Sequence, residues 1–204
     1  MTKFFTTLGF MLSIIMVATP VLGSAAEPTG VMVAERHTTS PDGHYKYCRR
    51  NPADCQLTLQ SLERLPLTAE LRNQLIWINT QVNRGVTPVT DREAHGVEDY
   101  WQNAGEAWRR RAGDCEEYVI LKREFLHNLG LPMSALLLTV VKQSNGEGHA
   151  VLTVRTDRGD LVLDNLTDVI KDWRNTPYQF LKRQSPKNPG AWELIADNHQ
   201  LASQ

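Results

Sequence analysis

The chain has 204 residues, of which 41% are hydrophobic and 22% are charged, which suits one globular domain with a core of its own. Its 22 Lys and Arg residues nearly balance 23 Asp and Glu residues, so no excess of positive charge favours nucleic acid. The composition also excludes a mainly disordered chain. There are three cysteines, an odd number that leaves at least one without an intramolecular partner.

The first 26 residues have the three-part layout of a secretory signal peptide. Lys3 is followed by an apolar stretch over residues 4–18, Pro20 interrupts it, and small residues precede Glu27. A membrane anchor is the alternative, but a span needs about 20 apolar residues and Pro20 ends this stretch early. We therefore expect residues 1–26 to be removed before Glu27. The mature protein is then periplasmic, with no further stretch apolar enough to span a membrane.

The next segment contains two of the three cysteines. Residues 27–44, rich in Pro, Thr, Gly and Ser, predict a flexible lead-in, and residues 45–204 predict a single domain. Cys48 and Cys55 flank the turn signal Asn51-Pro52, and such a turn brings two cysteines within disulfide distance in an oxidising compartment. We expect a Cys48–Cys55 bridge. The alternative is two independent small apolar side chains, and no nearby histidine pair supports a zinc site.

Two helices precede the strands. Thr68 begins the first, whose apolar residues recur at helical spacing until Gly85. Residues 86–112 are irregular, with a short helix expected over residues 106–111. The second helix begins after the N-cap Asp114 and is stopped by Gly130-Leu-Pro132.

Beyond the second helix the hydrophobic period becomes that of strands. Strands are expected over residues 136–141, 149–156 and 161–165, with a loop at 144–148 and a turn at 157–160. From Thr167 onward the pattern is mixed, and Trp173 and Trp192 are expected to pack against the body. Helices followed by antiparallel strands predict an α+β fold.

Cys115 is the thiol left over if the other two cysteines pair. A thiol at a helix N-terminus meets the positive end of the helix dipole, which favours the thiolate. The thiolate is the nucleophile of covalent acyl transfer. On position alone, a buried core cysteine is an equally ordinary interpretation.

His149 and Asp164 complete a possible triad with Cys115. His149 opens a strand after a glycine-rich loop, and Asp164 lies among apolar residues where a lone carboxylate is costly to bury. A tight hairpin centred on Arg158-Gly159 places Asp164 opposite Thr153, about 13 Å along the strand from His149. The triad therefore requires a register shift of two pairs or a bulge.

Three motifs together resemble the bacterial transglutaminase-like cysteine proteinases. They are Gly113-Asp-Cys-Glu-Glu-Tyr118 with Lys122, Gly148-His-Ala-Val-Leu152, and Leu161-Val-Leu-Asp-Asn-Leu166. The resemblance implies a papain/transglutaminase-like fold with the nucleophile at the N-terminus of a helix packed on an antiparallel sheet. It implies Cys115 as nucleophile, His149 as base and then acid, and Asp164 as the orienting residue. It favours peptide-bond hydrolysis over amine transfer.

The same resemblance extends to substrate and partners. LapG-type members of the family are periplasmic proteases that cut large adhesins from the cell surface, and an inner-membrane receptor responsive to cyclic di-GMP sequesters them. We therefore expect an exported or surface protein, such as a biofilm adhesin, as substrate, such a receptor as a partner, and no organic cofactor. Two alternatives stay open: transglutaminase or amidase chemistry on the same triad, and a non-catalytic relative that binds a peptide.

Asp114, Glu116 and Glu117 place three carboxylates beside Cys115, which by itself disfavours a thiolate. They are either an N-cap with acids suited to the helix dipole or calcium ligands, because LapG-type relatives bind calcium with acids at these places and hard oxygen ligands suit Ca²⁺. Glu117 stands where aspartate is typical of the family.

The oxyanion of acyl transfer needs hydrogen-bond donors. The Cys115 backbone N–H is one candidate, and Trp101, Gln102 or Asn103 could supply a second. For Trp101, a place in the core or the cleft wall is an equal alternative.

Overall fold

The computed structural model describes Met1, residues 30–57 and residues 64–196. The predicted signal peptide, residues 1–26, lies outside these residues except for Met1. No helix in the described part is long and apolar enough to cross a membrane.

Seven strands form one sheet in the order β1-β9-β8-β4-β5-β6-β7, and every neighbouring pair is antiparallel. The strands are β1 (Ala34–Thr38), β4 (Leu136–Lys142), β5 (Gly148–Thr156), β6 (Gly159–Leu163), β7 (Lys171–Asp172), β8 (Gln179–Ser185) and β9 (Asn188–Ile195). A short parallel pair, β2 (Thr87–Pro88) and β3 (Ala112–Gly113), lies apart from this sheet. The antiparallel sheet and the helices confirm the predicted α+β class.

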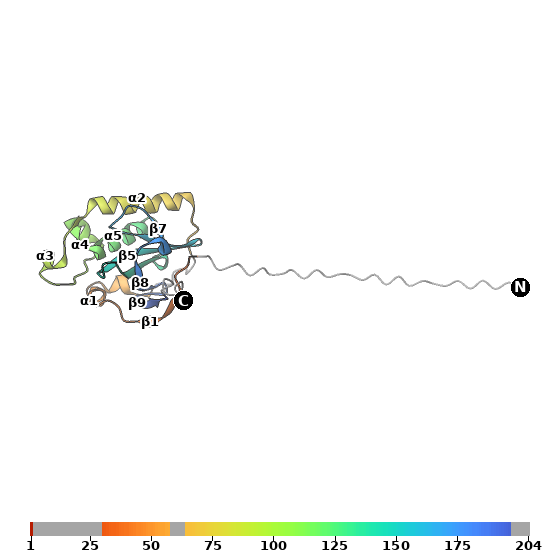
Figure 1. The fold of residues 1–204 in the computed structure, drawn as a ribbon, viewed down its shortest axis with the longest axis horizontal. Coiled ribbons are helices and arrows are strands. Elements are labelled where there is room, and N and C mark those ends of the chain that lie inside the picture. Colours follow the sequence, from red (N-terminus) through yellow and green to blue (C-terminus); the bar gives the residue numbers. More distant parts are fainter. Residues whose placement is uncertain (2–29, 58–63, 197–204) are drawn as a thin grey trace.

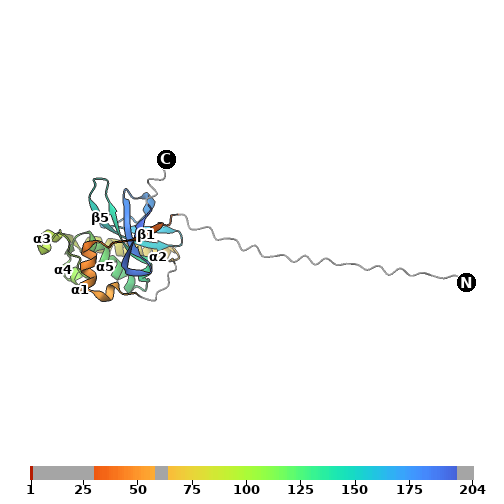
Figure 2. The same ribbon diagram turned by 90° about the horizontal axis from the view of Figure 1, so that it is seen from below.

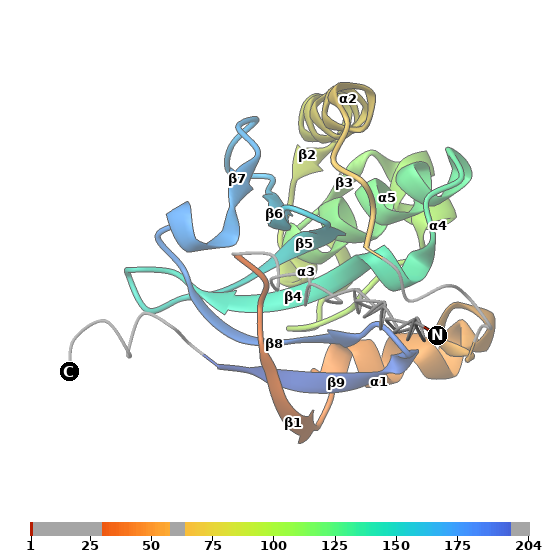
Figure 3. The same ribbon diagram turned by 90° about the vertical axis from the view of Figure 1, so that its right-hand side faces the viewer.

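The helices gather on one side of the sheet (Figures 1 and 3). They are α1 (Asp42–Arg50), α2 (Ala69–Gly85), α3 (Asp91–His95), α4 (Ala104–Arg110) and α5 (Cys115–Asn128). The described chain also has 3₁₀ turns, which are η1 (Pro52–Cys55), η2 (Met133–Ala135) and η3 (Trp173–Asn175). The predicted helices correspond to α2, α4 and α5, and Thr68 caps α2 by accepting a hydrogen bond from the Leu71 N–H. The apolar stripe of α2 is buried, as its spacing predicted.

The sheet is covered on both faces, because successive side chains of its central strands point to opposite sides. Leu138, Leu152 and Leu163 join the main core beneath α2 and α5. Val141, Val151 and Val162 join a second apolar cluster on the other face, together with Met32, Trp173, Tyr178, Phe180 and Ile195. Trp173 and Trp192 are buried, as expected.

The structure corrects the prediction of a flexible lead-in at residues 27–44. Its described part contains β1 and the start of α1, and Figure 2 shows both elements against the body of the fold. β1 pairs with β9, nearly the whole chain away, so local composition could not reveal it. Strands β8 and β9 were also missed, because their polar residues hide the alternation.

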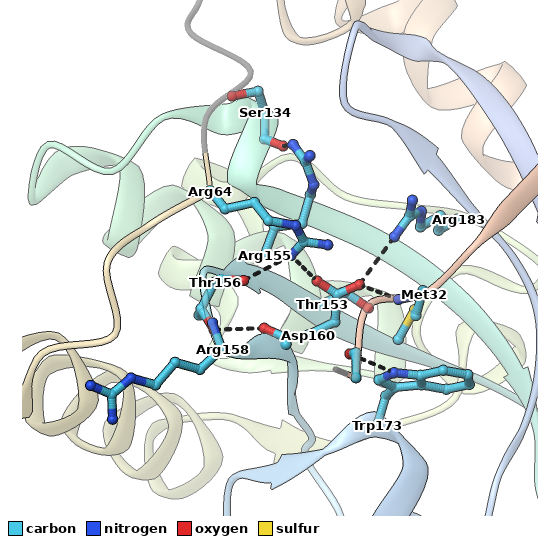
Figure 4. A network of polar contacts seen from close by, with 12 residues as sticks. Met32, Arg64, Ser134, Thr153, Arg155, Thr156, Arg158, Asp160, Trp173 and Arg183 are labelled. Atoms are coloured by element: carbon cyan, nitrogen blue, oxygen red, sulfur yellow. Dashed lines mark hydrogen bonds and ion pairs between the residues drawn. The ribbon is translucent and has the colours of Figure 1, made fainter. Parts of the chain in front are cut away.

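Asp160, on β6, ties three distant segments together (Figure 4). Its carboxylate is fully buried and accepts hydrogen bonds from the Met32 N–H at 2.8 Å and from Arg64 at 2.6 Å. Arg183 of β8 approaches the same carboxylate at 3.4 Å. These contacts hold the segment before β1 and the segment before α2 against the β5–β6 hairpin.

We predict that Asp160→Asn lowers the free energy of unfolding by about 3 kcal/mol, because it leaves buried guanidinium groups without their carboxylate. Urea unfolding followed by circular dichroism measures the change. Asp42→Asn is the control, since Asp42 pairs with Lys46 in solvent and should matter far less. Equal stability of the Asp160 variant and the parent would contradict the structural role of this contact.

Candidate active site

The register between β5 and β6 brings His149 and Asp164 together. Gly159 pairs with Thr156, so Val162, rather than Asp164, lies opposite Thr153. Compared with the predicted register, Asp164 lies two residues further along β5, toward His149, as the triad requires. The Thr156 hydroxyl donates to the Gly159 carbonyl at 2.6 Å and accepts from the Arg158 N–H, which closes the turn earlier than predicted.

Asp164 follows the last residue of β6 and accepts hydrogen bonds on both carboxylate oxygens. Oδ1 lies 2.8 Å from His149 Nε2 and accepts from the Leu166 N–H, and Oδ2 accepts from the Tyr178 hydroxyl. Burial raises the pKa of Asp164, but the hydrogen bonds from His149, Tyr178 and Leu166 outweigh it and hold the pKa below its usual value. Asp164 is therefore an anionic acceptor for His149.

The bond to Asp164 determines which nitrogen of His149 is available. An ionised carboxylate only accepts, so Nε2 carries the proton and Nδ1 remains to accept one from a thiol. Cys115 and His149 line the same cavity, together with Gly148 and Ala150 of β5. Among the residues that the structure describes, no hydrogen bond joins the Cys115 sulfur to His149.

The Cys115 thiol instead donates to Glu116 Oε2 at 3.0 Å. Burial raises the pKa of Cys115 well above its usual value, and the charge and hydrogen bond of Glu116 and the charge of Asp114 raise it further. The Ala150 N–H acts on the sulfur in the opposite direction. Burial and the neighbouring acids together keep Cys115 a thiol rather than a thiolate.

The predicted calcium ligands fall into two overlapping clusters. Oxygens of Asp114 and Glu116 lie within 4.8 Å of each other and of the Cys115 sulfur, while Asp114 and Glu117 form a second cluster with Asp91. Burial raises the pKa of Glu116 to about 8 and that of Glu117 to about 9, with neighbouring acids adding to both shifts. Asp114 Oδ1 is buried with no hydrogen-bond partner in the described part of the chain. A hard divalent cation fits this donor set.

Glu117 has a structural role in addition to its place in the acidic cluster. Its side chain is fully buried, and its oxygens accept from the Gln102 N–H at 2.8 Å and the Asp114 N–H at 3.0 Å. A Cβ at Gly113 would lie 2.6 Å from the Glu117 side chain, so only glycine fits there. Glu117 thus fixes the turn that presents Cys115.

Gln102 was predicted as a possible second donor to the oxyanion, and the structure limits this role to its side chain. Its backbone N–H is committed to Glu117, so it cannot serve as the second donor. The Gln102 side-chain amide and the Trp101 indole nitrogen are buried without partners among the described residues. The Asn103 side chain is engaged at both ends, since its Nδ2 donates to Asn51 Oδ1 at 3.3 Å and its Oδ1 accepts from the Glu106 N–H.

Pro41, the residue before helix α1, lines the cavity, and the sequence did not suggest that this segment reaches the site. The Cys48–Cys55 bridge is present, with a Cα–Cα distance of 5.6 Å, and ties α1 to η1. At the other end of α1, the Gly43 N–H donates to Asp99 at 2.7 Å. A Cβ at Gly43 would overlap the Asp99 carboxylate, so this close approach requires glycine.

Other residues at the site were not predicted as site residues from the sequence. Asp91, Glu98 and Asp99 line the cavity, and Tyr178 contacts Asp164. Asp91 follows Thr90, which caps α3, so its position looked like an ordinary first-turn acid. The mixed pattern after Thr167 gave no signal for Tyr178.

Lys122, on α5, is a buried cation close to this site. Its side chain is fully buried, and its Nζ has no hydrogen-bond partner among the described residues. Burial lowers the pKa of Lys122 to about 7, while the charges of Asp164 and Asp168 act in the opposite direction. The buried Lys122 ammonium group near Asp164 therefore lowers the stability of the fold.

A cysteine at a helix N-terminus, beside a His–Asp pair on an antiparallel sheet, defines a transglutaminase-like cysteine protease. The sequence profile of one family, described as bacterial transglutaminase-like cysteine proteinase BTLCP, matches residues 34–200. The chain belongs to this family, as its motifs predicted.

Solved structures of LapG from Legionella pneumophila share the fold. The calcium-bound form is 22% identical, with a TM-score of 0.53 over 76% of this chain and 81% of that chain. The EGTA-treated form is 23% identical, with a TM-score of 0.52 over 80% of this chain and 86% of that chain. A comparison with curated proteins finds no match.

We predict that Lys122→Met raises the free energy of unfolding near neutral pH by about 1 kcal/mol or more, because it removes a buried, unpaired charge. The folded-state pKa of about 7 lies below the unfolded value of 10.5. The Lys122 contribution to parental stability should therefore increase between about pH 7 and pH 10, and the variant should lack this increase. Urea unfolding at several pH values measures both effects. The exposed Lys46→Met is the control, and a less stable Lys122 variant would contradict the prediction.

Proposed function

We propose that this protein is a periplasmic thiol endopeptidase that cleaves an exported or surface protein through Cys115, His149 and Asp164. The observation that carries the proposal is the 2.8 Å contact between His149 Nε2 and Asp164, on the wall of a cavity that also contains Cys115. The signal-like residues 1–26 support export. Membership of a cysteine proteinase family supports hydrolysis over amine transfer.

In the proposed reaction, the Cys115 sulfur attacks the carbonyl carbon of the scissile bond while His149 Nδ1 takes the thiol proton. The tetrahedral intermediate collapses, the carbon–nitrogen bond breaks, and His149 returns the proton to the leaving amine. Water then attacks the thioester as His149 takes its proton, and the proton passes to the departing sulfur. Asp164 holds the imidazole and stabilises its cationic form. The Cys115 N–H and the Trp101 or Gln102 side chain are the proposed oxyanion donors.

We infer that calcium binds the acids beside Cys115, with Asp114 and Glu116 as ligands and Glu117 and Asp91 in the adjoining cluster. The carboxylate donors and the unpartnered Asp114 oxygen support this inference. A calcium-bound form of LapG, a protein of the same fold, is consistent with it. When bound, the cation supplies positive charge that offsets the carboxylates which disfavour the Cys115 thiolate.

A surface adhesin as substrate, and a sequestering receptor responsive to cyclic di-GMP as partner, are further parts of the proposal. They rest on the resemblance to LapG-type family members. A giant repeat adhesin or such a receptor, encoded by a gene next to the one for this protein, would support both parts of the proposal.

We predict that Cys115→Ala leaves the fold intact and lowers peptide cleavage by at least about 10³-fold, because no other side chain supplies the nucleophile. Mass spectrometry of surface proteins released by cells with the parent or the variant measures cleavage and identifies the substrate. Unfolding curves control for stability. Equal release by both would refute the proposed mechanism, and incorporation of a labelled amine without chain cleavage would indicate transglutaminase chemistry.

We predict that, in a chelator, the contribution of Glu116 and Glu117 to the free energy of unfolding falls as pH rises from about 4.5 toward 9. Glu116 and Glu117 have folded-state pKa values of about 8 and about 9, above the ordinary value of 4.5, so the folded state binds protons that the unfolded state releases. Calcium should raise the melting temperature clearly at about pH 8 and little at about pH 5. Differential scanning calorimetry with EGTA or calcium measures this. Glu116→Gln should weaken the calcium response, and an identical melting temperature with and without calcium at both pH values would exclude the site.

A further inference from the structure

Tyr178 is a buried residue that contacts both members of the His149–Asp164 pair. It lies between η3 and β8, and its side chain is 8% exposed. Its hydroxyl donates a hydrogen bond of 2.5 Å to Asp164 Oδ2. Its ring centroid lies 5.6 Å from that of His149, with the two planes inclined by 60°.

We propose that Tyr178 is a positioning residue, which fixes the Asp164 carboxylate and the His149 ring so that Nδ1 faces Cys115. This inference rests on the proposed function, because the His149–Asp164 pair has a reaction to serve only if Cys115 is a nucleophile.

The Asp164 carboxylate needs hydrogen-bond donors to keep one orientation. Its terminal torsion is broad and two-fold, so the group keeps one orientation only where donors hold it. His149 and the Leu166 N–H occupy Oδ1, and the Tyr178 hydroxyl is the hydrogen-bond donor to Oδ2 among the described residues. Without the hydroxyl, Oδ2 becomes a buried acceptor without a partner, and the carboxylate is free to turn toward another donor.

The Tyr178 ring packs against His149 and also belongs to the apolar cluster that contains Trp173 and Phe180. This cluster holds the ring in place, so the ring limits rotation of the imidazole and shields the His149–Asp164 bond from water. The proton then stays on Nε2, and Nδ1 remains the acceptor.

Burial and the charge of Asp164 both raise the pKa of Tyr178 above its usual value. Tyr178 is therefore a neutral hydroxyl donor at every pH at which a cysteine protease works.

A structural role in the second core cluster must be separated from a positioning role. Tyr178→Phe keeps the ring and removes only the hydroxyl. Tyr47 offers a matched control: it is also buried and donates its hydroxyl to a carboxylate, that of Asp54 in η1. A general cost of losing a buried hydroxyl should appear in both variants, whereas a positioning effect should appear only at residue 178.

The experiment measures alkylation of Cys115 by iodoacetamide in the purified full chain, which needs no knowledge of the substrate. The proteins compared are the parent, Tyr178→Phe, Tyr47→Phe and His149→Ala. We expect Tyr178→Phe to react about 10- to 100-fold more slowly than the parent, and Tyr47→Phe to react within about two-fold of it. Nitrogen-15 NMR of the His149 ring supplies the second readout. The parent should show the Nε2–H tautomer, and Tyr178→Phe should show a mixture of tautomers.

Parental alkylation and an unchanged His149 tautomer in Tyr178→Phe would overturn the inference while leaving the proposed function intact. Parental alkylation in His149→Ala would instead contradict the proposed function itself. If Tyr178→Phe fails to fold, 3-fluorotyrosine at position 178 is the second variant, because it keeps the ring and the hydroxyl and changes only the acidity. A shifted His149 Nε2–H resonance then supports the inference, and an unshifted one overturns it.

Discussion

The antiparallel register between β5 and β6 is the constraint on which the candidate site depends. A slip of one residue would send Asp164 to the opposite face of the sheet, and a slip of two would move it about 7 Å from its present position beside His149. The Thr156 hydroxyl closes the turn that sets this register. Asp160, in the same hairpin, is bonded to Arg64 and to the Met32 N–H, which lie far away in the sequence. The His149–Asp164 contact therefore depends on distant segments that bind the β5–β6 hairpin, in addition to the two strands themselves.

The site buries ionisable groups that the fold would be more stable without. Glu116 and Glu117 are buried next to a thiol, and Lys122 is buried behind Asp164 without a hydrogen-bond partner among the described residues. Each of these groups costs free energy in the folded state. Such costs persist where a function uses the charges, and here the carboxylates surround the predicted nucleophile. The buried acids and the geometry of the cavity thus both indicate a functional site at the N-terminus of α5.

Local signals in the sequence were sufficient for the elements that carry the predicted triad. The cap at Asp114 and the alternation from His149 identified the start of α5 and strand β5, and the odd cysteine identified Cys115. The β5–β6 register was predicted two residues out, because the Thr156 contacts that set it are not visible in a hydrophobic pattern. β1, α1 and Tyr178 were missed for a related reason, since each takes its role from partners remote in the chain. Gln102 shows the same limit, because its backbone N–H is bonded to Glu117 across fifteen residues.

The pairing of β1 with β9 has a consequence for the order in which the molecule assembles. Ala34 pairs with Ile195, so this contact closes a loop of about 160 residues and forms late compared with the hairpins of β4, β5 and β6. Helix α1 follows β1 directly and lays Gly43 against Asp99 in the cavity wall. The segment that leads into this contact is thus anchored only after the C-terminal strand has joined the sheet. Until then the chain carries Cys115 and the β5–β6 hairpin without the strand pairing that joins the two ends of its described part.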